Sequence, residues 1–328
     1  PLHSLGLLED AIVKIAGITG SAKIDFKKKT VFILCADNGI VEEGVTQTDS
    51  SVTASVVRGF TKGEGCVTLM AKKAGADCIP VDLGIADAIE NCGEAYPLVR
   101  EKIAFGTKNF IKEPAMTMEQ MMKAIDVGVE LVKKEKEKGT GMIAVGEMGI
   151  GNTTTSSAVA SVLLGKEPEE LTGRGAGLDD SGLQKKIQAI QVIETAINHY
   201  RLREESPLYV LQCVGGLDLA GMVGVYLGGA IYGLPILVDG IIAAAGALAA
   251  ARICPQTVSY MIATHVSKEP AGKMILEELG LNPLIDCGMC LGEGTGAVAA
   301  MPLFDMAACI YDDMKTFDQY QIEEYKPL

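Results

Sequence analysis

Short apolar runs alternate along this chain with longer segments in which apolar residues recur at helical spacing. The runs predict strands at Val31–Ala36, Cys78–Leu83, Met142–Val145, Leu208–Val214 and Leu234–Val238. Strands that alternate with helices are typical of a parallel sheet covered by helices. The pattern therefore predicts the α/β fold class, and we expect ligands at the carboxyl ends of the strands, where such sheets bind them.

The most apolar stretch, Met222 to Ile253, is long enough to resemble a membrane span. Pro235 and Asp239 interrupt it near its middle. A buried helix, a strand and a second, Ala-rich helix explain it better, because a strand buried on both faces also reads as a continuous apolar run. We therefore expect no membrane span.

Both ends of the chain show helical patterns with little strand signal. We expect residues 1–23 and 297–328 to form a small helical lobe, and residues 24–296 to form the large domain. A chain of 328 residues is long enough for these two parts and too short to require three independent cores.

Charge and composition narrow the range of partners. The formal net charge of -13 disfavours nucleic acids and anionic membranes, because both are polyanions. Aromatic residues make up only 5%, so stacking of bases on aromatic side chains is not expected. The 9 cysteines are scattered, which favours free thiols in a reducing compartment. We expect a cytoplasmic protein that binds small anionic molecules through local donors.

A glycine-rich loop, residues 146–153, follows a predicted strand and precedes a helix of small residues. Such a loop presents backbone N–H groups and a helix N-terminus to an anion. The spacing approaches that of the P-loop, but Asn152 stands where a lysine would reach the outer phosphates of a nucleoside triphosphate. A phosphate monoester therefore fits better than ATP, and a helix start that serves close packing is the alternative.

A second glycine cluster, residues 173–177, contains Arg174 and Gly175 and precedes a helix that carries Lys186. It could complete an anion site with cationic help, or it could be a flexible loop before an Asp-capped helix. Neither glycine cluster has the G-x-G-x-x-G form after an early strand, so the dinucleotide-binding fingerprint is not supported.

A third cluster places Glu293 between Gly292 and Gly294. Flanking glycines let a substrate approach the backbone closely, which suits a general base. A carboxylate that takes a proton near neutral pH needs burial or a nearby acid to raise its pKa, and Glu147 is the candidate for that acid. An exposed turn is the alternative interpretation.

Cys287 and Cys290 have the spacing of a zinc or redox pair. A structural zinc site needs four ligands, and the chain has 3 His and no second C-x-x-C pair. We therefore expect no metal, and we assign His265 to ordinary packing.

Taken in series, these segments resemble the nicotinate-nucleotide:dimethylbenzimidazole phosphoribosyltransferase family over nearly the whole chain. The matching segments, in order, are residues 4–9 (SLGLLE), 36–39 (ADNG), 43–45 (EGV), 106–110 (GTKNF), 146–154, 173–180, 265–270 (HVSKEP) and 288–296. So many matches in one order make chance similarity improbable. The resemblance implies a Rossmann-like large domain with a small helical lobe, a site at the carboxyl edge of the sheet, and a dimer.

The resemblance also implies a reaction and residue roles. The ribose phosphate of nicotinate mononucleotide would pass to a cobamide lower-ligand base, giving an α-ribotide and nicotinate, with no metal or redox cofactor. Glu293 matches the catalytic glutamate and Glu147 the acidic residue of the phosphate loop. The matching phosphate and nucleotide ligands are Gly149, Gly151, Asn152, Thr153, Arg174, Gly175 and Lys186. The acceptor-binding candidates are Asn38, Thr48, Val56, Met289 and Leu291.

Some positions depart from the family pattern. Asn38 stands where the family usually has His, and Val56 where it usually has a glutamine that hydrogen-bonds benzimidazole. The segment 239–245 has Ala where the family often has Ser. A benzimidazole-specific contact is thus lost, and the wall of the acceptor pocket becomes more apolar. Both changes make phenol or p-cresol an alternative acceptor.

Two further functions remain open at this point. A non-catalytic subunit could pair with an active paralogue, because family members that make phenolic cobamides work as pairs of paralogous chains. The retained Glu147, Glu293 and phosphate loop favour the enzyme. An NAD-dependent oxidoreductase would share the fold class but lacks its fingerprint. We predict an enzyme, with a homodimer or a heterodimer both open.

Overall fold

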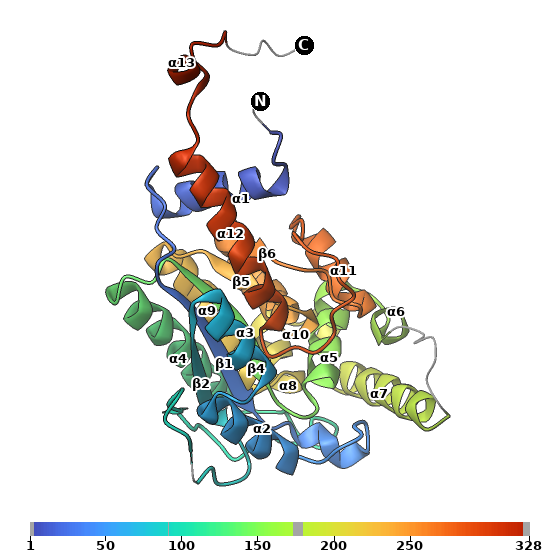
Figure 1. Ribbon diagram of the computed structural model, residues 1–328. Helices are drawn as coiled ribbons and strands as arrows, with labels where there is room; N and C mark the ends of the chain where they lie inside the picture. Colours follow the sequence, from blue (N-terminus) through green and yellow to red (C-terminus); the bar gives the residue numbers. More distant parts are fainter. Residues whose placement is uncertain (1–2, 91, 173–179, 324–328) are drawn as a thin grey trace.

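The computed structural model describes residues 3–90, 92–172 and 180–323 (Figure 1). They contain a six-stranded sheet in the order β3-β2-β1-β4-β5-β6, and every neighbouring pair is parallel. The strands are β1 (Lys29–Ala36), β2 (Ala76–Gly84), β3 (Val99–Arg100), β4 (Met142–Met148), β5 (Ile236–Val238) and β6 (Met261–Ala263). Reversal of the order beside β1 is the switch point of a Rossmann-type sheet. The predicted fold class is confirmed.

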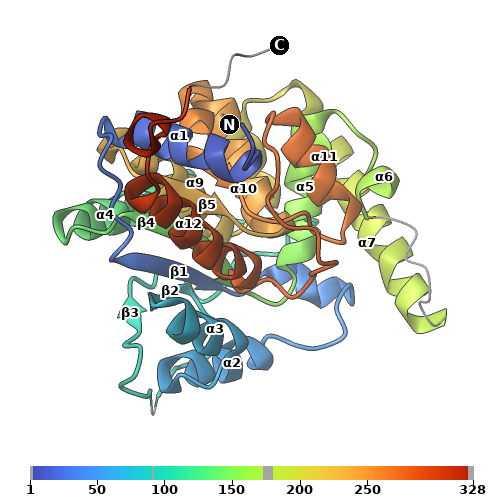
Figure 2. The same cartoon turned by 45° about the horizontal axis from the view of Figure 1, so that its top comes forward.

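Helices cover both faces of the sheet (Figures 1 and 2). All residues of β1 are buried, because its alternate side chains enter two different cores. One core joins the sheet to α1 (Leu7–Thr19), α2 (Ser51–Lys62), α3 (Cys66–Ala74) and α12 (Thr295–Asp313). The other joins it to α4 (Met118–Glu137), α5 (Asn152–Leu164), α6 (Pro168–Thr172), α7 (Asp180–His199), α8 (Pro207–Val214), α9 (Leu217–Tyr232), α10 (Ile241–Ile253) and α11 (Pro270–Glu278). The remaining short elements are η1 (Gly39–Glu43), η2 (Leu202–Glu204), η3 (Pro255–Tyr260) and α13 (Phe317–Tyr320).

The strand predictions are confirmed at β1, β2, β4 and β5, but Leu208–Val214 is wrong, because this run forms α8. Ser206 caps that helix by accepting a hydrogen bond from the N–H of Tyr209, and Pro207 occupies its first position. A short apolar run gives the same signal for a buried strand and a buried helix. No strand was predicted at β3 or β6, which span only 2 and 3 residues.

The apolar stretch Met222 to Ile253 folds as expected, into the end of α9, then β5, then α10. Among the described helices, none is both long enough and apolar enough to cross a membrane.

The two ends of the chain meet where α1 packs against α12 (Figures 1 and 2). α12 also packs against α3 and β4, so it reaches from α1 down to the carboxyl edge of the sheet. The division into a lobe and a large domain at residue 297 stays a prediction, and α12 itself begins just before that boundary.

Candidate functional site

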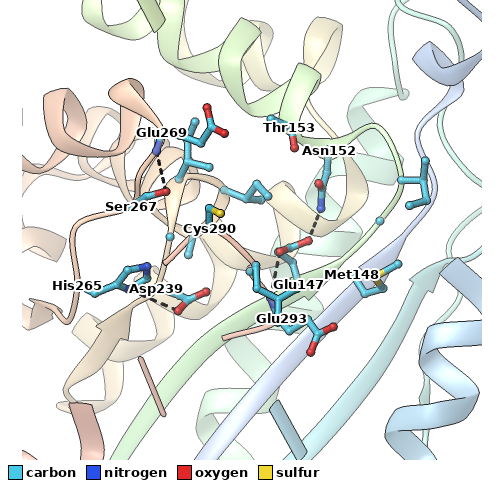
Figure 3. Close-up of a pocket in the computed structure, with 18 of the residues that line it drawn as sticks. Glu147, Met148, Asn152, Thr153, Asp239, His265, Ser267, Glu269, Cys290 and Glu293 are labelled. Atoms are coloured by element: carbon cyan, nitrogen blue, oxygen red, sulfur yellow. Dashed lines mark hydrogen bonds and ion pairs between the residues drawn. The ribbon is translucent and has the colours of Figure 1, made fainter. Parts of the chain in front are cut away.

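A cavity of about 320 Å³ lies beyond the carboxyl ends of β4, β5 and β6 (Figure 3). This volume falls at the lower end of the range for small-molecule pockets. Its wall contains several of the residues predicted from the sequence: Val56, Glu147, Gly149, Asn152, Thr153, Leu291 and Glu293. The cavity therefore joins the first glycine loop to the loop that carries Glu293.

The first glycine loop ends β4 and begins α5, whose first residues, Asn152 and Thr153, line the cavity. Gly151 is the N-cap of α5 and has a φ of 91°, a left-handed conformation that favours glycine. An added Cβ at Gly149 would collide with the carbonyl oxygen of Ala36. The N–H groups of Asn152 and Thr154 donate to the carbonyls of Gly149 and Gly151. The positive end of the helix dipole still makes this end of α5 a candidate site for an anion.

Glu147 is 7% exposed and links the two loops (Figure 3). Its Oε2 accepts a hydrogen bond from Nδ2 of Asn152, and its Oε1 accepts one from the backbone N–H of Glu293 at 3.3 Å. Burial raises the pKa of Glu147 to about 8, although the Asn152 amide opposes the rise. Near neutral pH this carboxyl is therefore largely protonated.

A second buried carboxyl stands behind Glu147. Asp218, in the first turn of α9, accepts a hydrogen bond from Nδ2 of Asn152 at 3.2 Å. Burial raises the pKa of Asp218 to about 6. The Asn152 amide thus bridges two acids, and the charge of Asp218 adds to the rise in the pKa of Glu147.

Glu293 is half-buried, and its φ of 63° is unusual for a residue with a side chain. Its Oε2 accepts a hydrogen bond from the backbone N–H of Val67 in the first turn of α3, at 3.2 Å. Burial raises its pKa, and the charge of Asp239 adds to the rise. The contributing acid is thus Asp239, whereas the sequence prediction named Glu147.

Asp239 and His265 also line the cavity, and no site role was predicted for either. Asp239 directly follows β5, one of the strand ends at which the sheet predicts ligands. His265 was assigned to packing. It is 3% exposed, as a packing residue would be, but its Nδ1 also lies 3.8 Å from Oδ1 of Asp239 (Figure 3). His265 begins the HVSKEP segment that matches the family, and this match could have indicated a role in the site.

The other predicted site residues lie outside the wall of this cavity. Asn38 is buried behind the glycine loop, where its Nδ2 donates to the carbonyl of Ile150 at 3.4 Å. Nζ of Lys186 donates to the carbonyl of Thr172 at 3.2 Å. The rest of this group is Thr48, which is exposed, Met289, which is half-buried, and Gly151, which is buried at the N-cap of α5. Arg174 and Gly175 fall outside the described residues, so their predicted roles have no structural counterpart here.

Cys287 and Cys290 are exposed free thiols. Over the described parts of the chain, no group of three or more His, Cys, Asp or Glu side chains is arranged to hold a metal ion.

Comparison with known proteins places this chain in a family. A phosphoribosyltransferase family model matches residues 1–322. Nicotinate-nucleotide–dimethylbenzimidazole phosphoribosyltransferase of Clostridium acetobutylicum is 47% identical over 328 residues, which cover 100% of this chain and 91% of the relative. The protein of the same name from Ruminiclostridium cellulolyticum is 45% identical over the same shares of both chains.

A solved structure gives the same result. The crystal structure of CobT from Thermus thermophilus has a TM-score of 0.89 and 36% identity, and the match covers 99% of this chain and 95% of that one. The resemblance that the sequence motifs indicated is confirmed over the whole length. The chain therefore belongs to the phosphoribosyltransferase family.

Proposed function

We propose that this enzyme transfers the phosphoribosyl group of nicotinate mononucleotide to an aromatic base that becomes the lower ligand of a cobamide. The similar proteins from Clostridium acetobutylicum and Ruminiclostridium cellulolyticum carry both substrates in their name. The observation that carries the proposal is the position of Glu147, which accepts hydrogen bonds from both Asn152 of the first glycine loop and Glu293. A loop that can bind phosphate and a candidate base therefore line the same cavity.

In the proposed reaction, the acceptor attacks C1 of the ribose from the face opposite nicotinate. A bond forms between C1 and the acceptor while the bond from C1 to the pyridinium nitrogen breaks, and the bonding pair leaves with nicotinate. Glu293 takes the proton that the acceptor loses. A raised pKa makes this carboxylate a stronger base near neutral pH, and burial supplies that rise.

The protonation state of Glu147 suits the binding of an anion. A carboxylate beside the N-terminus of α5 would repel a phosphate monoester, whereas an uncharged carboxyl does not. Because burial raises the pKa of Glu147 to about 8, the carboxyl is mostly neutral at pH 7. We infer that α5 binds the phosphate of the donor and that Glu147 holds the loop without opposing that charge.

Two acceptors fit the proposal. Dimethylbenzimidazole is the acceptor in the names of the relatives. Phenol or p-cresol is the second candidate, because Val56 lines the cavity together with Ile241, Ile242 and Ala243, which give that wall an apolar character. The dimer, with itself or with a paralogue, stays a prediction.

The test is an assay of the purified chain with nicotinate mononucleotide and either acceptor, in which nicotinate release and the α-ribotide are detected by mass. Glu293→Gln should lower turnover about 100-fold or more, the usual contribution of a positioned general base. Calorimetric binding of the donor should not change, because the phosphate loop is intact.

Glu277→Gln is the matched control, since Glu277 is exposed on α11 and should give normal turnover. Normal turnover of a folded Glu293→Gln variant would contradict the assignment of the base. If the chain alone released no nicotinate but became active with a paralogue, the non-catalytic subunit would replace the proposal.

A further inference from the structure

The loop that carries Glu293 has an unusual backbone. Gly292, Glu293 and Gly294 have φ values of 87°, 63° and 94°, so three successive residues are left-handed. Such a conformation is sparsely populated for Glu and persists only where the surrounding structure holds it. The Glu293 carboxylate can face an acceptor reproducibly only if this backbone is fixed.

Two buried carboxyls on neighbouring strands hold the loop. Glu147, near the end of β4, accepts the N–H of Glu293 at 3.3 Å. Asp239, directly after β5, accepts the N–H of Gly294 at 3.1 Å through Oδ2 and the N–H of Ala297 at 2.9 Å through Oδ1. Consecutive N–H groups of the loop are thus bound by consecutive strands of the sheet. Asp239 alone also fixes the first turn of α12.

His265 supports Asp239 from the next strand. It follows β6 by two residues, and its Nδ1 lies 3.8 Å from Oδ1 of Asp239 and has no hydrogen bond within the described residues. Its ring lies so close to Gly296 that an added Cβ there would collide with it. The imidazole therefore lies between the Asp239 carboxylate, beside which Figure 3 shows it, and the first turn of α12.

We propose that Asp239, supported by His265, is a positioning residue that fixes the left-handed loop so that the Glu293 carboxylate faces the acceptor. The inference rests on the proposed function, because it assumes that Glu293 is the base. Asp239 itself touches neither substrate in this role and acts through the backbone of residues 294–297.

A helix cap without any role in catalysis would make the same two hydrogen bonds, so the test must separate the two roles. Asp239→Asn keeps the shape of the side chain but replaces one acceptor oxygen by an NH2 group that faces a backbone N–H. If Asp239 positions Glu293, kcat should fall about 10- to 100-fold, the range expected for a misplaced catalytic group. KM for nicotinate mononucleotide should stay within about threefold, because β4 and the start of α5 are unchanged.

A double-mutant cycle supplies the decisive measurement. In a Glu293→Gln background there is no base left to misplace, so Asp239→Asn should lower kcat by less than about twofold further. Equal losses in both backgrounds, or a normal kcat in the folded Asp239→Asn variant, would overturn the inference. A normal kcat in Glu293→Gln alone would remove Glu293 as the base and with it the premise of the inference. Absence of nicotinate release by the wild type would instead overturn the proposed function, so the failures are distinguishable.

Two more variants complete the experiment. Glu135→Gln also removes a buried carboxylate, one that accepts hydrogen bonds from Thr30 and Thr140 away from the cavity. It should lower Tm and leave kcat unchanged. If Asp239→Asn does not fold, Gly296→Ala tests the same support, because its methyl group displaces the His265 ring while Asp239 stays in place. A folded Gly296→Ala variant should show the same loss of kcat and the same dependence on Glu293, and a normal kcat would contradict the inference.

Discussion

Burial of Glu147 couples the stability of the fold to the pH of the site. The pKa of Glu147 is raised from 4.5 to about 8 in the folded chain, so between these values the folded state holds a proton that the unfolded state has lost. Its contribution to stability is therefore fully present below pH 4.5 and is lost as pH rises through about 8. Within that window, the free energy of unfolding should fall by up to about 1.4 kcal/mol per pH unit.

Glu147→Gln removes this titration, so the stability of the variant should change less than that of the wild type between about pH 6 and pH 9. Denaturant unfolding at the two pH values measures the difference. Glu135→Gln is the control. Burial raises the pKa of Glu135, but hydrogen bonds from Lys138, Thr140 and Thr30 outweigh that effect and lower it, so its contribution is lost only at acidic pH. Parallel curves for the wild type and Glu147→Gln would show that Glu147 ionises normally.

Individual site residues could be predicted where a short sequence segment marks them as candidates. Glycines around Glu293 and after Glu147 marked both acids, and both line the cavity. Asp239 was harder to assign, because its partners are backbone N–H groups of Gly294 and Ala297, far away in the sequence. The residues around Asp239 in the sequence do not specify those contacts. They depend on the folded sheet, in which β5 lies beside β4.

At the scale of elements, α5 offers an internal comparison, because it begins and ends with left-handed glycines. Gly151 at the N-cap has a φ of 91°, and Gly165 at the C-cap has a φ of 65°. Replacement of either by Ala should cost about 1–3 kcal/mol of stability through backbone strain. An added Cβ at Gly151 would also lie 2.9 Å from the side chain of Val41, whereas one at Gly165 would meet no atom within 4 Å among the described residues beyond its immediate chain neighbours.

Gly151→Ala should therefore shift the first turn of α5 and raise the Kd for nicotinate mononucleotide about tenfold, if that turn binds the phosphate. Gly165→Ala should lose similar stability and keep the wild-type Kd. Calorimetry with the donor alone measures both. Unchanged donor binding in a folded Gly151→Ala variant would show that the phosphate is bound elsewhere.

Elements were predictable where length or chemistry separates helix from strand. Residues 31–36 of β1 are apolar and follow no helical spacing, and the strand forms as predicted. α8 is also mainly apolar, and Ser206 at its N-cap with Pro207 at its first position were the signs of a helix start. The short strand β6 pairs with β5 over three residues, a length at which sequence pattern carries little information.

At the scale of the whole molecule, the strand order determines which residues lie together in the candidate site. β4, β5 and β6 are neighbours, so Glu147, Asp239 and His265 meet at one edge although they lie far apart in the sequence. α12 then brings Glu293 to the same edge from the end of the chain, because its first turn binds Asp239. The sheet fixes where the cavity lies, while its apolar wall comes from α2 and the start of α10.

We expect the choice of acceptor to depend on that wall, and Val56 of α2 is the residue to change. Benzimidazole has two ring nitrogens, and the one remote from Glu293 would lose its hydrogen bond to water without gaining a partner from Val56. Leaving a buried polar atom unpaired costs about 1–3 kcal/mol. A phenol has no second nitrogen, but its pKa, near the value of about 10 for Tyr, lies far above that of a carboxylate, so proton transfer to Glu293 must accompany formation of the bond to C1.

These two effects oppose each other, and a competition assay decides which is larger. With p-cresol and dimethylbenzimidazole at equal concentration, we expect the wild type to form the O-linked ribotide of p-cresol in measurable amount. Val56→Gln should raise the ratio of kcat/KM for dimethylbenzimidazole over p-cresol about tenfold, because the amide pairs with the remote nitrogen. Val56→Leu keeps the wall apolar and should leave the ratio near the wild-type value. Exclusive use of dimethylbenzimidazole, by the chain alone and with any co-purifying paralogue, would rule out the phenolic acceptor while leaving phosphoribosyl transfer and the role of Glu293 intact.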